Sequence, residues 1–143
     1  FRELIETRAV DIIHPDLLTS GGMLETKKIA DYAEWHGIPT ALHFAGSPIA
    51  FMANLHVAAA VPSFVALEHH GLDLPFWNGL VTGMPEPLME GGYVRVPDKP
   101  GLGVDLNLEG IEANLRFPGL FEPTDEWNTP KLGFWQPDKR WDK

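Results

Sequence analysis

The sequence contains no cysteine, so neither disulfide bonds nor thiolate chemistry can contribute to the fold or to a site. Basic residues are also few, because 11 lysines and arginines face 20 aspartates and glutamates and give a formal net charge of −9. Phosphate backbones and anionic lipid surfaces repel such an acidic chain. We therefore expect no binding to nucleic acid and none to membranes.

Long apolar runs are absent as well. No stretch is long enough to cross a bilayer, and the N-terminus lacks the charged-then-apolar pattern of a secretory signal, so we expect a cytoplasmic protein. The apolar fraction of 44% is that of an ordinary globular protein, and 143 residues suffice for one core. The chain opens on Phe1 with a helix-like pattern and no methionine, which indicates a piece of a longer protein.

Three short apolar runs, each closely followed by an ionisable residue, organise the chain. Such runs are typical of buried parallel strands, and the helical patterns between them favour right-handed crossovers. In a parallel α/β barrel the carboxyl ends of the strands meet at one mouth, so we expect the three ionisable side chains to converge. The runs are residues 10–13, 38–42 and 64–67, and the ionisable residues are Asp16, His43 and Glu68.

Two helices are expected between these strands. The first covers residues 22–36 and ends at Gly37, which can adopt the left-handed conformation of a helix end. The second begins at Ser47 and Pro48, a preferred cap followed by the residue best suited to the first helical position, and continues to about residue 60. The face that the first helix should bury consists of Met23, Ile29, Ala30 and Ala33.

The pattern changes after Glu68. We expect a small hairpin over residues 88–97 with a Gly-Gly turn, and a short helix over residues 108–115. From residue 117 onward the periodicity ends. The chain thus divides into residues 1–116 and an aromatic, proline-rich tail, 117–143, which we expect to dock on the first part or on a partner. The tail carries Trp127, Trp135 and Trp141.

His43 and Asp16 form the most informative pair. A histidine beside a carboxylate is a good general base, because the carboxylate fixes the tautomer and stabilises the imidazolium. Asp16 is the natural partner, since neighbouring parallel strands end side by side. Structural alternatives stay open: a packed or surface His43, a loop-capping Asp16, and a solvated Glu68 at a strand end.

The remaining candidates carry less signal. His69 and His70 could indicate a metal, but neighbours on a strand point to opposite faces, so metal binding by the pair is not favoured. His14 and His56 are interpreted as structural. Trp77 can line the rim of a substrate pocket, with packing in the core as the favoured alternative.

One ordered set of motifs resembles the C-terminal part of the enolase superfamily, in its mandelate racemase and acid-sugar dehydratase branch. The resemblance covers residues 1–116, and the spacing from Asp16 to His43 fits the dyad of that branch. It implies an α/β fold, the C-terminal portion (about three β/α units) of a TIM-type barrel with an irregular tail. The motifs are Asp11-Ile12-Ile13-His14-Pro15-Asp16, Gly21-Gly22, Gly37-Ile38-Pro39-Thr40-Ala41-Leu42-His43, Ser47-Pro48, Leu67-Glu68, Glu90-Gly91-Gly92-Tyr93 and Pro100-Gly101-Leu102-Gly103.

The resemblance also implies roles. His43 would be the general base or acid at the end of the seventh barrel strand, and Asp16, ending the sixth, its dyad partner. Glu68, ending the eighth, would hydrogen-bond the substrate carboxylate or the enediolate. The reaction removes a proton next to a carboxylate, and Mg²⁺ stabilises the resulting charge. The resemblance puts the carboxylate ligands of Mg²⁺ on earlier barrel strands, so we expect no metal ligand in this chain.

Three functions follow from this resemblance. The first is a Mg²⁺-dependent, galactonate dehydratase-like lyase acting on a sugar acid; the second is a racemase or epimerase of the mandelate racemase type. The third is a non-catalytic half-barrel that acts only as an assembly partner. A complete barrel needs about 250 residues. We therefore expect the chain to be inactive alone, with the N-terminal part of the enzyme as its partner, and to form a homo-oligomer.

Overall fold

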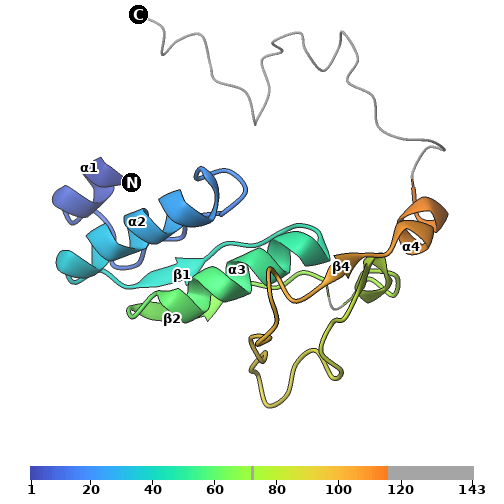
Figure 1. Cartoon of the computed structure of the whole chain (residues 1–143). Helices are drawn as coiled ribbons and strands as arrows, with labels where there is room; N and C mark the ends of the chain where they lie inside the picture. Colours follow the sequence, from blue (N-terminus) through green and yellow to red (C-terminus); the bar gives the residue numbers. More distant parts are fainter. Residues whose placement is uncertain (72, 116–143) are drawn as a thin grey trace, which may run out of the picture.

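The computed structural model describes residues 1–71 and 73–115 (Figure 1). The expected tail, 117–143, lies outside the described residues. No helix within the described ranges is long and apolar enough to cross a bilayer. In chain order the elements are α1 (Arg2–Glu6), α2 (Gly22–Trp35), β1 (Thr40–Leu42), α3 (Pro48–Ala60), β2 (Phe64–Leu67), the 3-10 turn η1 (Asn78–Leu80), β3 (Val81–Thr82), β4 (Asp105–Leu106) and α4 (Leu108–Ala113).

The centre of the molecule is a parallel pair of strands. β1 and β2 are hydrogen-bonded neighbours, with Leu42 opposite Leu67 at their carboxyl ends. α3 connects them and lies alongside the pair in Figure 1. This confirms the predicted strand–helix–strand unit, and it puts the residues that follow β1 and β2 side by side.

The run before Pro15, predicted as a strand, is not a regular strand. It makes two isolated parallel bridges to the β1 segment, Ile13 to Thr40 and Asp16 to His43. Pro15 has no N–H to donate, so it interrupts the ladder between the bridges. Its carbonyl still accepts a hydrogen bond from the backbone N–H of His43 at 3.1 Å. The prediction of a strand was wrong. The segment nevertheless runs parallel to β1 and brings Asp16 to His43.

Both predicted helices are present, and local chemistry explains how they begin. The Oγ of Ser47 accepts a hydrogen bond from the backbone N–H of Ala50 at 3.4 Å, and Pro48 is the first residue of α3. α2 begins at Gly22, after Gly21 in a left-handed conformation with φ of 101°. The prediction that α2 buries Met23 was wrong, because this side chain is 41% exposed. Thr26 is buried together with Ala30 and Ala33 instead.

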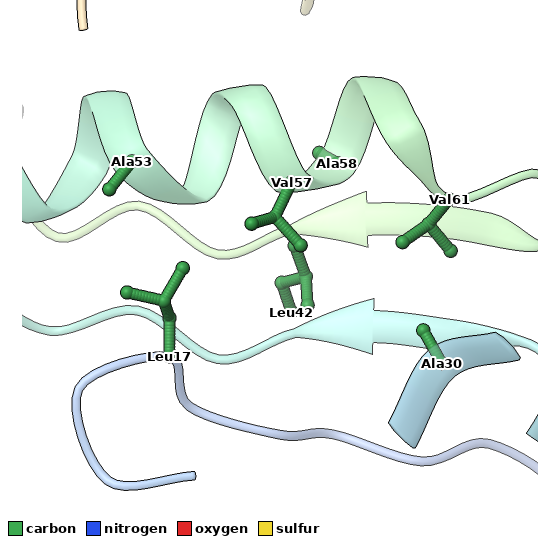
Figure 2. Packing of buried hydrophobic residues seen from close by; sticks show 7 residues of the cluster. All are labelled: Leu17, Ala30, Leu42, Ala53, Val57, Ala58 and Val61. Carbon is green, nitrogen blue, oxygen red and sulfur yellow. The ribbon is translucent and has the colours of Figure 1, made fainter. Parts of the chain in front are cut away.

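A core cluster under α3 ties the helices to the strands. Figure 2 shows Leu42 of β1 and Val57 of α3 pointing toward one another. Leu42 is fully buried, and because it directly precedes His43, its packing holds the backbone from which His43 extends. The cluster consists of Leu17, Ala30, Leu42, Ala53, Val57, Ala58 and Val61.

β2 is more exposed than its apolar sequence predicts. Phe64 is 37% exposed and Val65 54%, and among the described residues β1 alone pairs with this strand. Its open side borders a cavity of about 450 Å³ that is also lined by Phe51 and Val94. An apolar strand with an unpaired edge is a surface that proteins normally cover.

The second half of the described chain contains less regular structure than predicted. The Gly-Gly turn is present: Glu90 and Tyr93 exchange two backbone hydrogen bonds of 2.8 and 3.0 Å across Gly91 and Gly92, both with positive φ. The flanking residues 88–97 do not pair further, so the predicted hairpin is reduced to this turn. The short helix is confirmed as α4, although it ends at Ala113. β3 and β4 pair in antiparallel fashion and were not predicted, because two-residue strands show no periodicity.

Candidate active site

The three ionisable residues predicted to converge do so. His43 directly follows β1, Glu68 directly follows β2, and Asp16 follows Pro15 on the neighbouring segment. His43 contacts both carboxylates, with Asp16 at its Nδ1 and Glu68 on the side of its Nε2. The backbone pairing of the three segments therefore builds the cluster.

Asp16 and His43 form a hydrogen-bonded pair. The Nδ1 of His43 lies 2.6 Å from the Oδ2 of Asp16. The other oxygen, Oδ1, accepts hydrogen bonds from the backbone N–H groups of Leu18 and Thr19 at 2.7 and 3.2 Å. Asp16 is thus surrounded by donors, so His43 donates from Nδ1 and the neutral ring keeps its lone pair on Nε2. That is the tautomer a general base needs.

Glu68 is held by donors at both of its oxygens. Its Oε1 lies 2.6 Å from the Nε2 of His70, and its Oε2 accepts a hydrogen bond from the backbone N–H of Phe44 at 3.2 Å. These bonds lower the pKa of Glu68, His70 contributing most and Phe44 next, with smaller contributions from the charges of His43 and His70 against an opposing effect of burial. The carboxylate is therefore ionised at neutral pH and acts as an acceptor.

Two further imidazole nitrogens face the Oε2 of Glu68. The Nε2 atoms of His43 and of His14 each lie 3.5 Å from it. The Nδ1 of His14 lies 3.3 Å from the carbonyl of Ala41, and because a carbonyl only accepts, this nitrogen carries the hydrogen. The two rings meet edge to face with centroids 5.4 Å apart. His14 is thus a direct neighbour of the dyad.

Sequence reasoning missed the positions of His14 and His70. It treated His14 as structural and His70 only as half of a disfavoured metal pair. A signal was present, since His14 lies two residues before Asp16 and His70 two residues after Glu68. Residues two apart in extended backbone lie on the same side, so each histidine faces the site with its carboxylate.

His69 has a different environment from its neighbours. Its ring stacks on Phe51 with centroids 4.5 Å apart and lies 4.9 Å from Trp77. Its Nδ1 accepts a hydrogen bond from the backbone N–H of Gly71 at 3.3 Å. Burial, and then the charge of His70, lower the pKa of His69, so it stays neutral. It anchors the segment between β2 and the following loop.

Trp77 is a core residue in this structure. Its side chain is 3% exposed, it packs edge to face against Phe44 and Phe51, and its indole N–H donates to the carbonyl of Gly46 at 2.9 Å. It thereby supports the segment that follows His43. A contact between Trp77 and a substrate stays a prediction.

A divalent metal is not accommodated by these side chains. Within residues 1–71 and 73–115, no group of three or more His, Cys, Asp or Glu side chains could hold a metal ion. The side chains around Glu68 are chiefly imidazoles, whereas Mg²⁺ prefers oxygen ligands in octahedral geometry. His69 and His70 also point into different surroundings, one into the aromatic cluster and the other to Glu68. The contacts among these side chains are therefore interpreted as hydrogen bonds and charge contacts, without a metal ion among them.

Comparison with curated proteins gives close relatives. The D-xylonate dehydratase of Haloferax volcanii is 48% identical over 114 residues, which cover 80% of this chain and 27% of that relative. Among solved structures, an enolase from Pantoea ananatis with bound D-gluconate and Mg has a TM-score of 0.71 and 35% identity, covering 83% of this chain and 28% of that one. A putative L-alanine-DL-glutamate epimerase from Burkholderia xenovorans gives a TM-score of 0.71 and 33% identity, covering 79% and 28%.

These likenesses settle the fold. The neighbours are enolase-superfamily TIM-type barrels, and this chain corresponds to a C-terminal part of such a barrel, spanning less than a third of each of these proteins. That confirms the resemblance and the fold class that the motifs implied. Residues 1–110 match the family model described as enolase C-terminal domain-like, and the chain therefore belongs to that family.

Proposed function

We propose that this chain supplies the proton-transfer residues of a sugar-acid dehydratase, a lyase. The observation that carries the proposal is the 2.6 Å contact between His43 and Asp16, which leaves the Nε2 of His43 free as a base. The D-xylonate dehydratase and the arabinonate dehydratase among the relatives support a sugar acid as the substrate.

In this proposal the Nε2 of His43 removes the proton on the carbon next to the substrate carboxylate. The electrons of that C–H bond move into an enediolate, and Asp16 stabilises the imidazolium that forms. The bond from the β-carbon to its hydroxyl then breaks. The departing hydroxide needs a proton, which the imidazolium of His43 carries, so water leaves. The enol that remains tautomerises to a 2-keto acid.

Glu68 would face the substrate carboxylate or the enediolate. In the free protein it is ionised, and a carboxylate cannot donate a hydrogen bond to another anion. A substrate carboxylate close to Glu68 raises its pKa, because like charges disfavour ionisation. Glu68 then takes up a proton when substrate binds and donates it as a hydrogen bond. Proton uptake on binding is therefore part of the proposal.

A metal in the complete enzyme would supply electrostatic stabilisation of the enediolate. The Mg bound in the Pantoea ananatis neighbour supports Mg²⁺ as the cofactor. We propose that its ligands come from barrel strands other than those of this chain. The N-terminal part of the enzyme is in that sense the partner this chain needs.

A racemase or epimerase is the second candidate, supported by the epimerase among the structural neighbours. Both reactions begin with the same proton transfer and differ in whether water is lost. An assay in deuterated water separates them, since a racemase incorporates deuterium at the α-carbon without forming a 2-keto acid.

The test is a chimera in which this chain replaces the matching part of the Haloferax volcanii D-xylonate dehydratase. We expect it to convert one or more sugar acids from a panel to 2-keto acids, and the His43→Asn variant to lose at least about a thousandfold in kcat. His36→Ala, at a half-buried histidine that follows α2 and contacts Tyr32, is the matched control and should keep full activity. Unchanged turnover in His43→Asn would refute the proposal, and a folded but inactive chimera favours the half-barrel that acts only in assembly.

Two expectations about the whole protein remain predictions. One is a cytoplasmic location, and the other is a homo-oligomer. Light scattering on the purified chain and on the complete enzyme measures the second.

A further inference from the structure

We propose that His70 is a positioning residue that fixes the orientation of Glu68, so that one oxygen of this carboxylate always faces His43. Its effect on turnover rests on the function proposed above, whereas its effect on Glu68 does not.

The geometry around Glu68 carries this inference. Oε1 is held by the Nε2 of His70 at 2.6 Å, and Oε2 by the backbone N–H of Phe44 at 3.2 Å. The last torsion of a glutamate is broad and nearly two-fold, so one contact alone does not fix the carboxylate plane. Two donors, one on each oxygen, do fix this plane. With Oε1 engaged by His70, Oε2 is the oxygen that lies 3.5 Å from the Nε2 of His43.

The backbone explains why His70 is available for this task. His69, between the two residues, is anchored in the aromatic cluster, 4.5 Å from the ring of Phe51. Successive side chains of extended backbone point to opposite sides, so fixing His69 inward turns Glu68 and His70 together toward the site. The position of His70 therefore follows from packing on the other side of the chain.

His70 also has the strongest influence on the charge of Glu68. The ionisable groups that face this carboxylate are His14, His43 and His70, with Asp16 behind His43. Among the causes that lower the pKa of Glu68, the hydrogen bond from His70 is the largest. Removing the imidazole should therefore raise that pKa toward the ordinary value for a glutamate.

The experiment uses the 143-residue chain itself. The backbone N–H of Phe44 bonds to Glu68, so its amide resonance in ¹H–¹⁵N NMR follows the titration of that carboxylate. We expect the titration midpoint to move to higher pH in His70→Ala and to return toward the original value in His70→Gln, whose side-chain amide keeps a donor near the position of Nε2. His36→Ala is the matched control and should leave the midpoint unchanged, and dispersed amide spectra verify that each variant is folded.

An unchanged midpoint in His70→Ala overturns the proposal, and so does an equal rise in His36→Ala or a rise that His70→Gln does not reverse. Turnover is read separately in the chimera. There His70→Ala should lower kcat/KM on the order of tenfold to a hundredfold through misplacement of Glu68, with partial recovery in His70→Gln. If the midpoint shifts as expected but the chimera shows no dehydration, the dehydratase assignment fails while the positioning role stands.

Discussion

Asp16 and His43 are joined twice, by a parallel backbone bridge and by the 2.6 Å contact between their side chains. The spacing of the dyad is therefore set by main-chain pairing, and its orientation by the two backbone N–H groups that hold Asp16. A pair fixed in this way needs no rearrangement before it accepts a proton.

Replacing Asp16 by Asn tests this arrangement. The amide can donate to the Nδ1 of His43, which moves the ring hydrogen to Nε2 and removes the lone pair that acts as base. We expect kcat in the chimera to fall about 10³- to 10⁴-fold with little loss of stability. ¹⁵N chemical shifts of His43 report the tautomer. Asp31→Asn on α2, which loses a partly exposed ion pair with Lys27, is the control and should change neither quantity.

Glu68→Gln should change how stability depends on pH. The pKa of Glu68 is lowered in the folded chain, so its stabilising contribution is complete above the ordinary pKa of a glutamate and is lost as pH falls through the lowered folded pKa. The free energy of unfolding of the original chain should therefore decline more steeply below about pH 4.5 than that of the variant. Urea unfolding at several pH values measures both slopes, and parallel slopes would contradict the described contacts of Glu68.

His69→Phe should change how stability depends on pH. Phenylalanine removes the Nε2 of His69, which is buried without a hydrogen-bond partner, and keeps the stack on Phe51, but it also removes the Nδ1 that accepts from the backbone N–H of Gly71. Because these two changes oppose each other, we expect the free energy of unfolding at neutral pH to change by less than about 1 kcal/mol. The stability of the variant relative to the original chain should increase as pH falls below about 6.5, because the lowered pKa of His69 makes the unfolded chain bind the proton more readily. A difference that stays constant between pH 7 and pH 5 would contradict this.

Leu42→Ala should cost about 2–5 kcal/mol of stability, because Leu42 is fully buried against Val57 under α3. Leu24→Ala on α2 removes the same atoms from a side chain that is 70% exposed, and should cost less than about 0.5 kcal/mol. Denaturant unfolding compares the two. Equal losses would mean that the cluster under α3 is not the core that supports His43.

Sequence patterns predicted what depends on local chemistry. Ser47 and Pro48 mark the beginning of α3, and the dyad follows from two segments that end side by side. The strand before Pro15 could not be predicted correctly, because whether a short apolar run completes a ladder depends on a neighbour far away in the chain. Met23 was misplaced for a related reason, since the choice between it and Thr26 is made by packing.

The sequence predicted the three central residues of the candidate site, Asp16, His43 and Glu68, but not the histidines that surround Glu68. His43 and Asp16 could be recognised as a pair from their residue types and their places after two strands. His14 and His70 join the site only through their contacts with Glu68, which they approach from different segments. Alternation in extended backbone would have put His14 on the side of Asp16 and His70 on the side of Glu68. Their distances to Glu68 required the three-dimensional structure.

The position of His69 in the aromatic cluster has a consequence for insertions and deletions near the site. Residues 67–70 alternate between core and site, so the loss of one residue there would exchange their surroundings and put a carboxylate among Phe51 and Trp77. Among natural variants of this protein, we therefore expect residues 67–70 to be free of gaps.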